Sequence, residues 1–201
     1  QMALLHTLGK LPGKRVLVVG LGKSDAFTED TIRDVMAESC RYLRRTGVQR
    51  AATIAHGAGI GGQEGEAAAR AMAEGAILGL YTFRQHRTND EDSKELKVLE
   101  IVEHDDSKLP GFQRGIESGR IAAEGAALAR DLVNQPANRL TPTDMAEAAQ
   151  QVAEEHRLEV EVLDREQCEE LGMGAFLGVA RGSAEPPKLI VLRYRGDPDN
   201  P

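Results

Sequence analysis

Short apolar runs alternate with longer helical segments along the first half of the chain. Residues 15–21, 51–55 and 96–102 are rich in Val, Ile, Leu and Ala and have the length of buried strands. The segments between them, residues 29–46 and 64–79, are predicted to be helices, and the second is rich in Ala. Strands that alternate with helices predict an α/β fold with largely parallel strand pairing.

The second half continues this alternation on a smaller scale. Apolar residues between positions 115 and 134 approximate helical spacing, which predicts a long connecting helix. It is followed by a predicted helix at 142–156, a strand at 159–163, a short helix with Asp164 as its N-cap, and a strand at 188–194. Two strands make a small sheet for an independent domain, so we expect this part to be the beginning of a larger one.

Residues 129–146 stop one helix and start the next within a few positions. Pro136 has no backbone N–H and restricts the residue before it, so the connecting helix is expected to end near Asn134 or Gln135. Thr141 offers an N-cap oxygen, and Pro142 stands at the first helical position, where a missing N–H is harmless. The segment is therefore predicted to be a junction, with a new helix that starts at about Pro142.

Composition limits both the core and the partners. Hydrophobic residues make up 41% of the chain but aromatic residues only 3%, so the core is expected to consist of Ala, Val, Leu and Ile in closely packed helices. The formal charge of −7, from 25 basic and 32 acidic residues, argues against general binding to nucleic acid or to an anionic membrane. No apolar run approaches the roughly 20 residues that cross a bilayer, which favours a soluble intracellular protein.

Two glycine-rich loops suggest a binding module as an alternative function. Residues 57–62 fit the pattern G-x-G-x-x-G between a strand and a helix, but the acidic residue expected about 20 positions later is absent, because residues 80–84 read LYTFR. Residues 20–24 resemble the end of a phosphate-binding loop, but the position of its first Gly is occupied by Leu17. These loops leave open a stand-alone module that binds a nucleotide or ADP-ribose.

Side chains that could carry catalysis or bind metal show no recognisable spacing. The five histidines are isolated from one another, and only His56 lies beside a glycine-rich loop. Glu169 and Glu170 are adjacent on a short predicted helix, where solvated charge is the simpler interpretation. Cys40 and Cys168 are far apart and are expected to be reduced and structural.

Several fixed positions in the junction carry a family resemblance. The order DLVNxPxNxLTP at residues 131–142 closely resembles the segment that opens the catalytic domain of the leucyl aminopeptidases, the cytosol aminopeptidase family of two-metal peptidases. The resemblance continues through LGMGAFLGV at 171–179 and GSAEPPKLI at 182–190. Before the junction, RVLVVGLGK at 15–23 is similar to a strand of that family's non-catalytic N-terminal domain.

This resemblance implies three parts in the chain. Residues 1–112 would form part of a macro-domain-like N-terminal α/β domain, 113–138 a linker helix and junction, and 139–201 the first β/α elements of a larger α/β peptidase domain. ADP-ribose is a possible ligand by analogy with the macro-like fold. Compared with the family, the chain is expected to be truncated at both ends.

The resemblance also implies the chemistry of the complete enzyme. Members of the family remove an N-terminal amino acid, often Leu, from peptides with two divalent ions, usually manganese or zinc, and they form hexamers. Their metal ligands and catalytic Lys and Arg begin at a stretch similar to Gly-Lys-Gly-x-Thr-Phe-Asp, which is expected a few residues after Pro201. We therefore expect a cytoplasmic aminopeptidase fragment with no catalytic, cofactor-binding or metal-binding residue of its own. Asn134, Pro136 and Asn138 are expected to shape the backbone of the junction and to take no part in the chemistry.

Overall fold

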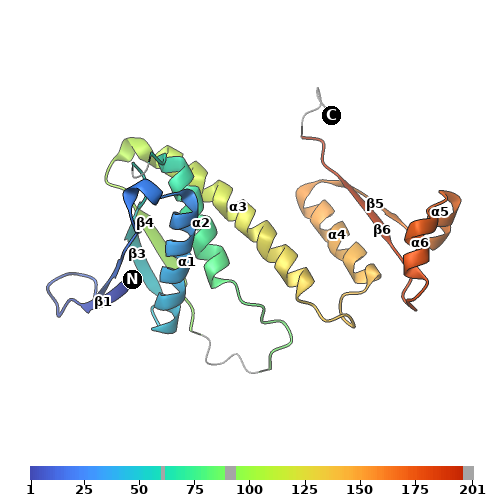
Figure 1. Ribbon diagram of the computed structural model, residues 1–201, viewed down its shortest axis with the longest axis horizontal. Coiled ribbons are helices and arrows are strands. Elements are labelled where there is room, and N and C mark those ends of the chain that lie inside the picture. The colour runs from blue at the N-terminus through green and yellow to red at the C-terminus, as the bar shows by residue number, and fades with distance from the viewer. Residues whose placement is uncertain (60–61, 89–93, 197–201) are drawn as a thin grey trace. The chain divides into compact units, whose positions relative to one another are not determined.

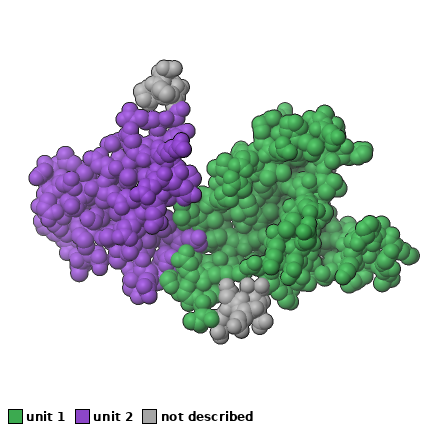
Figure 2. Space-filling view, turned by 180° about the vertical axis from the view of Figure 1, so that it is seen from behind, with its two compact units in different colours: residues 1–130 green, residues 131–201 purple. Residues whose placement is uncertain are grey.

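The computed structural model describes residues 1–59, 62–88 and 94–196, and the chain divides into two compact units (Figures 1 and 2). Unit 1 is Gln1–Arg130 and unit 2 is Asp131–Pro201. Both units combine helices with strands, which confirms the predicted α/β class. Among the described residues, no helix combines the length and apolar character needed to cross a membrane.

In its described residues, unit 1 contains two separate two-stranded sheets, the helices α1 and α2, and most of helix α3 (Figure 1). Strands β1 and β2 form an antiparallel hairpin. Strand β3 pairs in parallel with β4, and helix α2 lies in the connection between these two strands. The elements are β1 (Met2–His6), β2 (Arg15–Val19), η1 (Ser24–Ala26), α1 (Glu29–Arg45), β3 (Arg50–Ile54), α2 (Gly65–Leu80), β4 (Val98–Val102), η2 (Asp106–Lys108) and α3 (Leu109–Val133).

The prediction of largely parallel pairing is wrong. Of the three strand pairs in the described parts of the chain, only β3–β4 is parallel. The sequence pattern does not predict strand β1, and the short turn between it and β2 can join only antiparallel neighbours. In that turn the N–H of Thr7 donates to the carbonyl of Lys14 at 3.1 Å, while Leu8 and Gly9 take positive φ angles of 52° and 81°.

The apolar core of unit 1 lies between α1, α2 and β4. Helix α1 begins at the N-cap Thr28 and turns Ile32, Met36 and Cys40 inward at intervals of four residues. These side chains meet small residues of α2 together with Met72, and Leu99 and Ile101 of β4 pack against the same cluster. The buried members of the cluster are Phe27, Ile32, Met36, Cys40, Ala68, Ala71 and Met72.

Helices α1 and α2 touch through their backbones because α2 carries glycine at the contact. A Cβ atom added to Gly79 would lie 2.6 Å from the Cα of Ala37, and one added to Gly75 would collide with the backbone of Arg33. Such distances are shorter than atoms of side chains tolerate. The spacing of four residues places both glycines on the same face of α2.

Helix α3 approaches the other side of α2 in the same way. A Cβ atom on Gly115 would collide with the carbonyl oxygen of Glu66, and one on Gly119 with that of Arg70. The helix begins at Leu109, earlier than the predicted residue 115, because a proline in the first turn removes no needed hydrogen bond. The predicted connecting helix is therefore confirmed, but it begins at Leu109 and not at residue 115.

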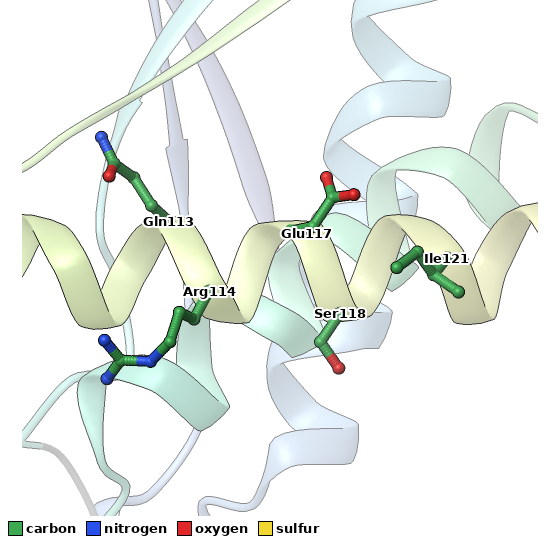
Figure 3. A pocket seen from close by; sticks show the side chains of 5 residues that line it. All are labelled: Gln113, Arg114, Glu117, Ser118 and Ile121. Atoms are coloured by element: carbon green, nitrogen blue, oxygen red, sulfur yellow. The ribbon is translucent and has the colours of Figure 1, made fainter. Parts of the chain in front are cut away.

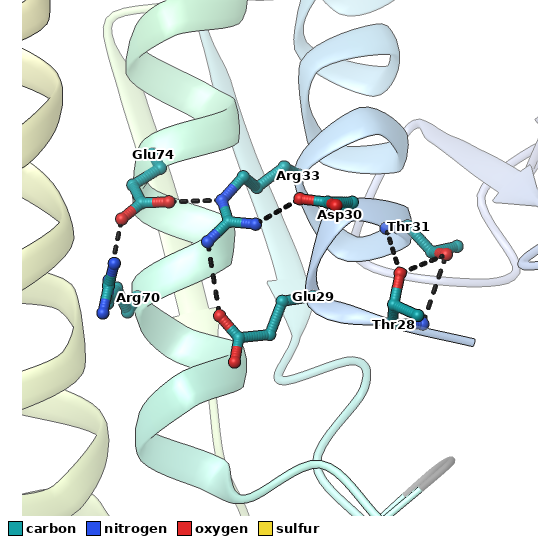
Figure 4. Close-up of polar contacts among 7 residues, drawn as sticks. All are labelled: Thr28, Glu29, Asp30, Thr31, Arg33, Arg70 and Glu74. Atoms are coloured by element: carbon teal, nitrogen blue, oxygen red, sulfur yellow. Dashed lines mark hydrogen bonds and ion pairs between the residues drawn. The ribbon is translucent and has the colours of Figure 1, made fainter.

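A buried carboxylate also joins α1 to α2 (Figure 4). The side chain of Glu74 is only 9% exposed; it accepts hydrogen bonds from Nε of Arg33 on α1 and, at 2.8 Å, from Nε of Arg70 on α2. Arg33 additionally pairs with Asp30 at 2.6 Å and Glu29 at 3.3 Å. Burial raises the pKa of Glu74, but the hydrogen bonds from the two arginines outweigh it and hold that pKa below its ordinary value.

The sheet of β3 and β4 is covered by these helices on one face. On the opposite face the structure, within its described residues, leaves Ile54 73% exposed and its register partner Val102 54% exposed. Arg50 and Glu100 form an ion pair of 2.8 Å on the same strands. A parallel pair with one bare apolar face is unusual, since parallel sheets are normally covered on both sides.

Unit 2 is an antiparallel ribbon with one larger helix against it. Its elements are α4 (Pro142–His156), β5 (Glu159–Leu163), α5 (Arg165–Glu170), α6 (Gly174–Ala180) and β6 (Leu189–Arg193). Ion pairs cross the exposed side of the ribbon, with Arg193 at 2.9 Å from Glu161 and Arg195 at 2.7 Å from Glu159. The predicted strands and helices of this half are confirmed, although β5 and β6 pair antiparallel.

Replacing Gly119 with Ala tests the contact between α2 and α3. The added methyl group would meet the carbonyl oxygen of Arg70 and lie 3.0 Å from the Cβ of Ala73, so we expect a loss of about 1–3 kcal/mol in the free energy of unfolding. Gly125→Ala is the matched control in the same helix, because nothing lies within 4 Å of its added Cβ. It should stabilise by up to about 1 kcal/mol. Urea denaturation of both variants measures the difference, and equal stabilisation would contradict the packing.

Glu74→Gln tests the buried ion pair. Removing the negative charge leaves Arg33 and Arg70 with a weaker acceptor, and we expect a loss of about 1–3 kcal/mol at neutral pH. Glu38→Gln, on the exposed pair with Arg41, should cost less than about 1 kcal/mol.

The pH dependence of the same variant has a defined sign. Because the folded-state pKa of Glu74 lies below 4.5, its stabilisation is present above pH 4.5 and is lost as pH falls through the folded-state pKa. The difference in stability between wild type and Glu74→Gln should therefore shrink only in acid. A difference that stays constant from neutral pH to about pH 2 would contradict this assignment.

Candidate functional site

The junction between the two units has the predicted geometry. Helix α3 ends at Val133, and the N–H groups of Arg139 and Leu140 donate to the carbonyl of Pro136 at 2.8 and 3.1 Å, which closes a turn. Helix α4 then begins at Pro142. The backbone of this segment is thus organised by its own turn, as the pattern of prolines predicts.

Thr141 and Asp144 form a reciprocal cap at the start of α4. The carboxylate of Asp144 accepts from the N–H of Thr141 at 2.8 Å, and the N–H of Asp144 donates to the hydroxyl of Thr141 at 3.3 Å. The Thr141 hydroxyl and N–H lower the pKa of Asp144. This carboxylate is therefore used to start a helix, and its charge also suits the helix N-terminus.

Near the C-terminal end of α3, a cation–π contact within unit 1 joins this helix to the residue after α2. The guanidinium carbon of Arg130 lies 5.5 Å from the ring centroid of Tyr81, the residue that follows α2. The contact comes at the C-terminal end of the helix pair that Gly115 and Gly119 bring together. It fixes the last turns of α3 before the junction.

Metal-binding side chains are not grouped in the described parts of the chain. Nowhere among them do three His, Cys, Asp or Glu side chains lie close enough to hold an ion. A centre of two divalent ions needs several such ligands around a shared water. The described residues therefore do not fit a two-metal site.

The glycine-rich loop at 57–62 is described only in part, because residues 60 and 61 lie outside the described residues. Gly57 has a φ of 94°, and a Cβ added there would lie 3.0 Å from Cγ1 and 2.5 Å from Cδ1 of Ile32. Glycine at this position thus lets the chain turn directly over the apolar core. A packing requirement accounts for it without a ligand.

The loop at 20–24 continues the N-terminal hairpin. The N–H of Gly20 donates to the carbonyl of Gln1 at 3.0 Å, which adds one rung to the ladder of β1 and β2. Gly22 has a φ of 86°, and Ser24–Ala26 form a single 3-10 turn. These groups close a strand end and begin the approach to α1, which accounts for the loop as a strand-ending turn.

His56 is the only histidine beside a glycine-rich loop, and it is partly buried. Its Nε2 atom is enclosed and has no hydrogen-bond partner within the described structure. Burial lowers the pKa of His56, although a hydrogen bond with the backbone of Ile54 acts in the opposite direction. The neutral form of the ring is therefore favoured at neutral pH.

The two cysteines are free and buried, which confirms that they form no disulfide. Burial raises the pKa of the Cys40 thiol to about 11. At neutral pH this group is protonated and a poor nucleophile. Cys40 packs instead against Met36, with 3.8 Å between the two sulfur atoms.

A shallow surface depression follows the outer side of α3 (Figure 3). It is lined by side chains of this helix alone, and its charged groups are already paired. Arg114 lies 2.6 Å from Glu66, and Glu117 lies 2.7 Å from Arg120. The depression therefore brings no side chains together from different elements. It is lined by Gln113, Arg114, Glu117, Ser118 and Ile121.

Solved structures with this arrangement include a maturation enzyme and a leucine aminopeptidase. The bottromycin maturation enzyme BotP, in a complex with Mn, superposes with a TM-score of 0.82 at 32% identity, over 97% of this chain and 39% of that one. A mutant of tomato leucine aminopeptidase superposes with a TM-score of 0.78 at 29% identity, over 94% of this chain and 37% of that one. The fold thus defines a leucine aminopeptidase-like protein.

Sequence comparison identifies the family. Residues 1–90 match the N-terminal domain of the cytosol aminopeptidase family, and residues 127–201 match its catalytic domain. The chain belongs to the cytosol aminopeptidase family, as its junction motif predicts. These matches give no support to the alternative of a stand-alone nucleotide-binding module.

Curated relatives agree over almost the whole chain. A probable cytosol aminopeptidase of Alkaliphilus metalliredigens is 42% identical over 195 residues, which are 96% of this chain and 39% of the relative. One from Solibacter usitatus is also 42% identical over 195 residues, 97% of this chain and 39% of the relative. The chain thus spans about two fifths of the length of these relatives.

The lowered pKa of His56 predicts acid sensitivity. Because the folded-state pKa lies below the ordinary value of 6.5, stability should be full above pH 6.5 and should fall as pH drops from 6.5 toward the folded-state value. The fall is at most about 1.4 kcal/mol per pH unit. His56→Asn should remove this part of the pH dependence.

Thermal unfolding between about pH 5 and pH 8 measures the effect. His104→Asn, at an exposed position, is the control and should keep the wild-type pH profile. If His56→Asn kept the wild-type slope below pH 6.5, the buried neutral histidine would be the wrong explanation.

Proposed function

We propose that this chain is the N-terminal domain and the first part of the catalytic domain of a leucyl aminopeptidase, an enzyme that releases N-terminal amino acids, often Leu, from peptides. The observation that carries the proposal is the order of the two family matches: residues 1–90 to the N-terminal domain and 127–201 to the catalytic domain. The long helix α3 leads from the first match into the second.

The division of the chain is part of this proposal. We assign residues 1–112 to the macro-like N-terminal domain, 113–138 to the linker helix and junction, and 139–201 to the peptidase domain. The compact units, which divide after Arg130, support a boundary within the linker. The turn closed by the carbonyl of Pro136 supports a structural role for the junction.

Within the complete enzyme we assign this chain the role of scaffold. The enzyme would use two divalent ions, manganese or zinc, to activate water and polarise the scissile carbonyl. The similarity to BotP, whose structure was solved in complex with Mn, supports a divalent metal in the complete enzyme. The ligands and the catalytic Lys and Arg are proposed to lie in segments beyond residue 201, and no ion is assigned to this segment.

Assembly and location follow from the family in the same way. We propose that the complete enzyme is a cytoplasmic homo-oligomer, a hexamer, with peptides as its substrates. The family's name, cytosol aminopeptidase, supports the location. The acidic balance of 32 carboxylates against 25 basic side chains gives no reason to expect nucleic acid as a general partner.

An aminopeptidase assay tests the division between scaffold and catalytic machinery. The 201-residue chain, supplied with Mn²⁺ or Zn²⁺ and a leucine amide, should give no turnover above that of the metal alone. A full-length member of the family, assayed in the same buffers, is the positive control. Metal-dependent release that co-elutes with the folded chain in gel filtration would contradict the proposal.

A further inference from the structure

We draw no further inference here: the strongest candidate, the bare apolar face of the β3–β4 sheet around Ile54 and Val102, carries nothing because nothing in the structure shows what covers it.

Discussion

The fold of unit 1 depends on backbone contact between helix α2 and the helices on either side of it. Gly75 and Gly79 admit α1, and Gly115 and Gly119 let α3 approach from the other side. At such close approach many weak dispersion contacts form between main-chain atoms, and each missing side chain is what makes room for them. This explains how a chain with 3% aromatic residues builds a core mainly from Ala, Met, Ile and Cys, with Phe27 as its one aromatic member in the described cluster.

The contact with α2 also positions helix α3 ahead of the junction. The first half of the helix is held by Phe112 and its glycines, while its end is held by Arg130 over Tyr81. The junction therefore follows a helix end that is held by these contacts. The turn closed by the carbonyl of Pro136 then leads into α4. The interactions described in this segment cap helix α4, close a turn and pack α3 against unit 1.

Sequence patterns predict the helices and the junction because their signals are local. Pro136, Thr141 and Pro142 act on their immediate neighbours, and apolar spacing along α1 and α4 follows the helical period. Strand pairing could not be predicted as well, because the partner of a strand is chosen by contacts that are distant in sequence. For this reason the sequence did not predict two antiparallel pairs, the hairpin of β1 and β2 and the ribbon of β5 and β6.

The helix contacts made by glycine in α2 could not be predicted from the sequence either, because they also depend on residues distant in sequence. In the sequence alone Gly75 weakens a helix, and only the structure places it against the backbone of Arg33. We expect helix packing, strand pairing and the ion pairs of Glu74 to stabilise this polypeptide without a bound metal ion. Thermal unfolding of the chain with EDTA, and with increasing Mn²⁺ or Zn²⁺, tests it most directly: the midpoint should not change, and a saturable rise accompanied by stoichiometric metal uptake would contradict the claim.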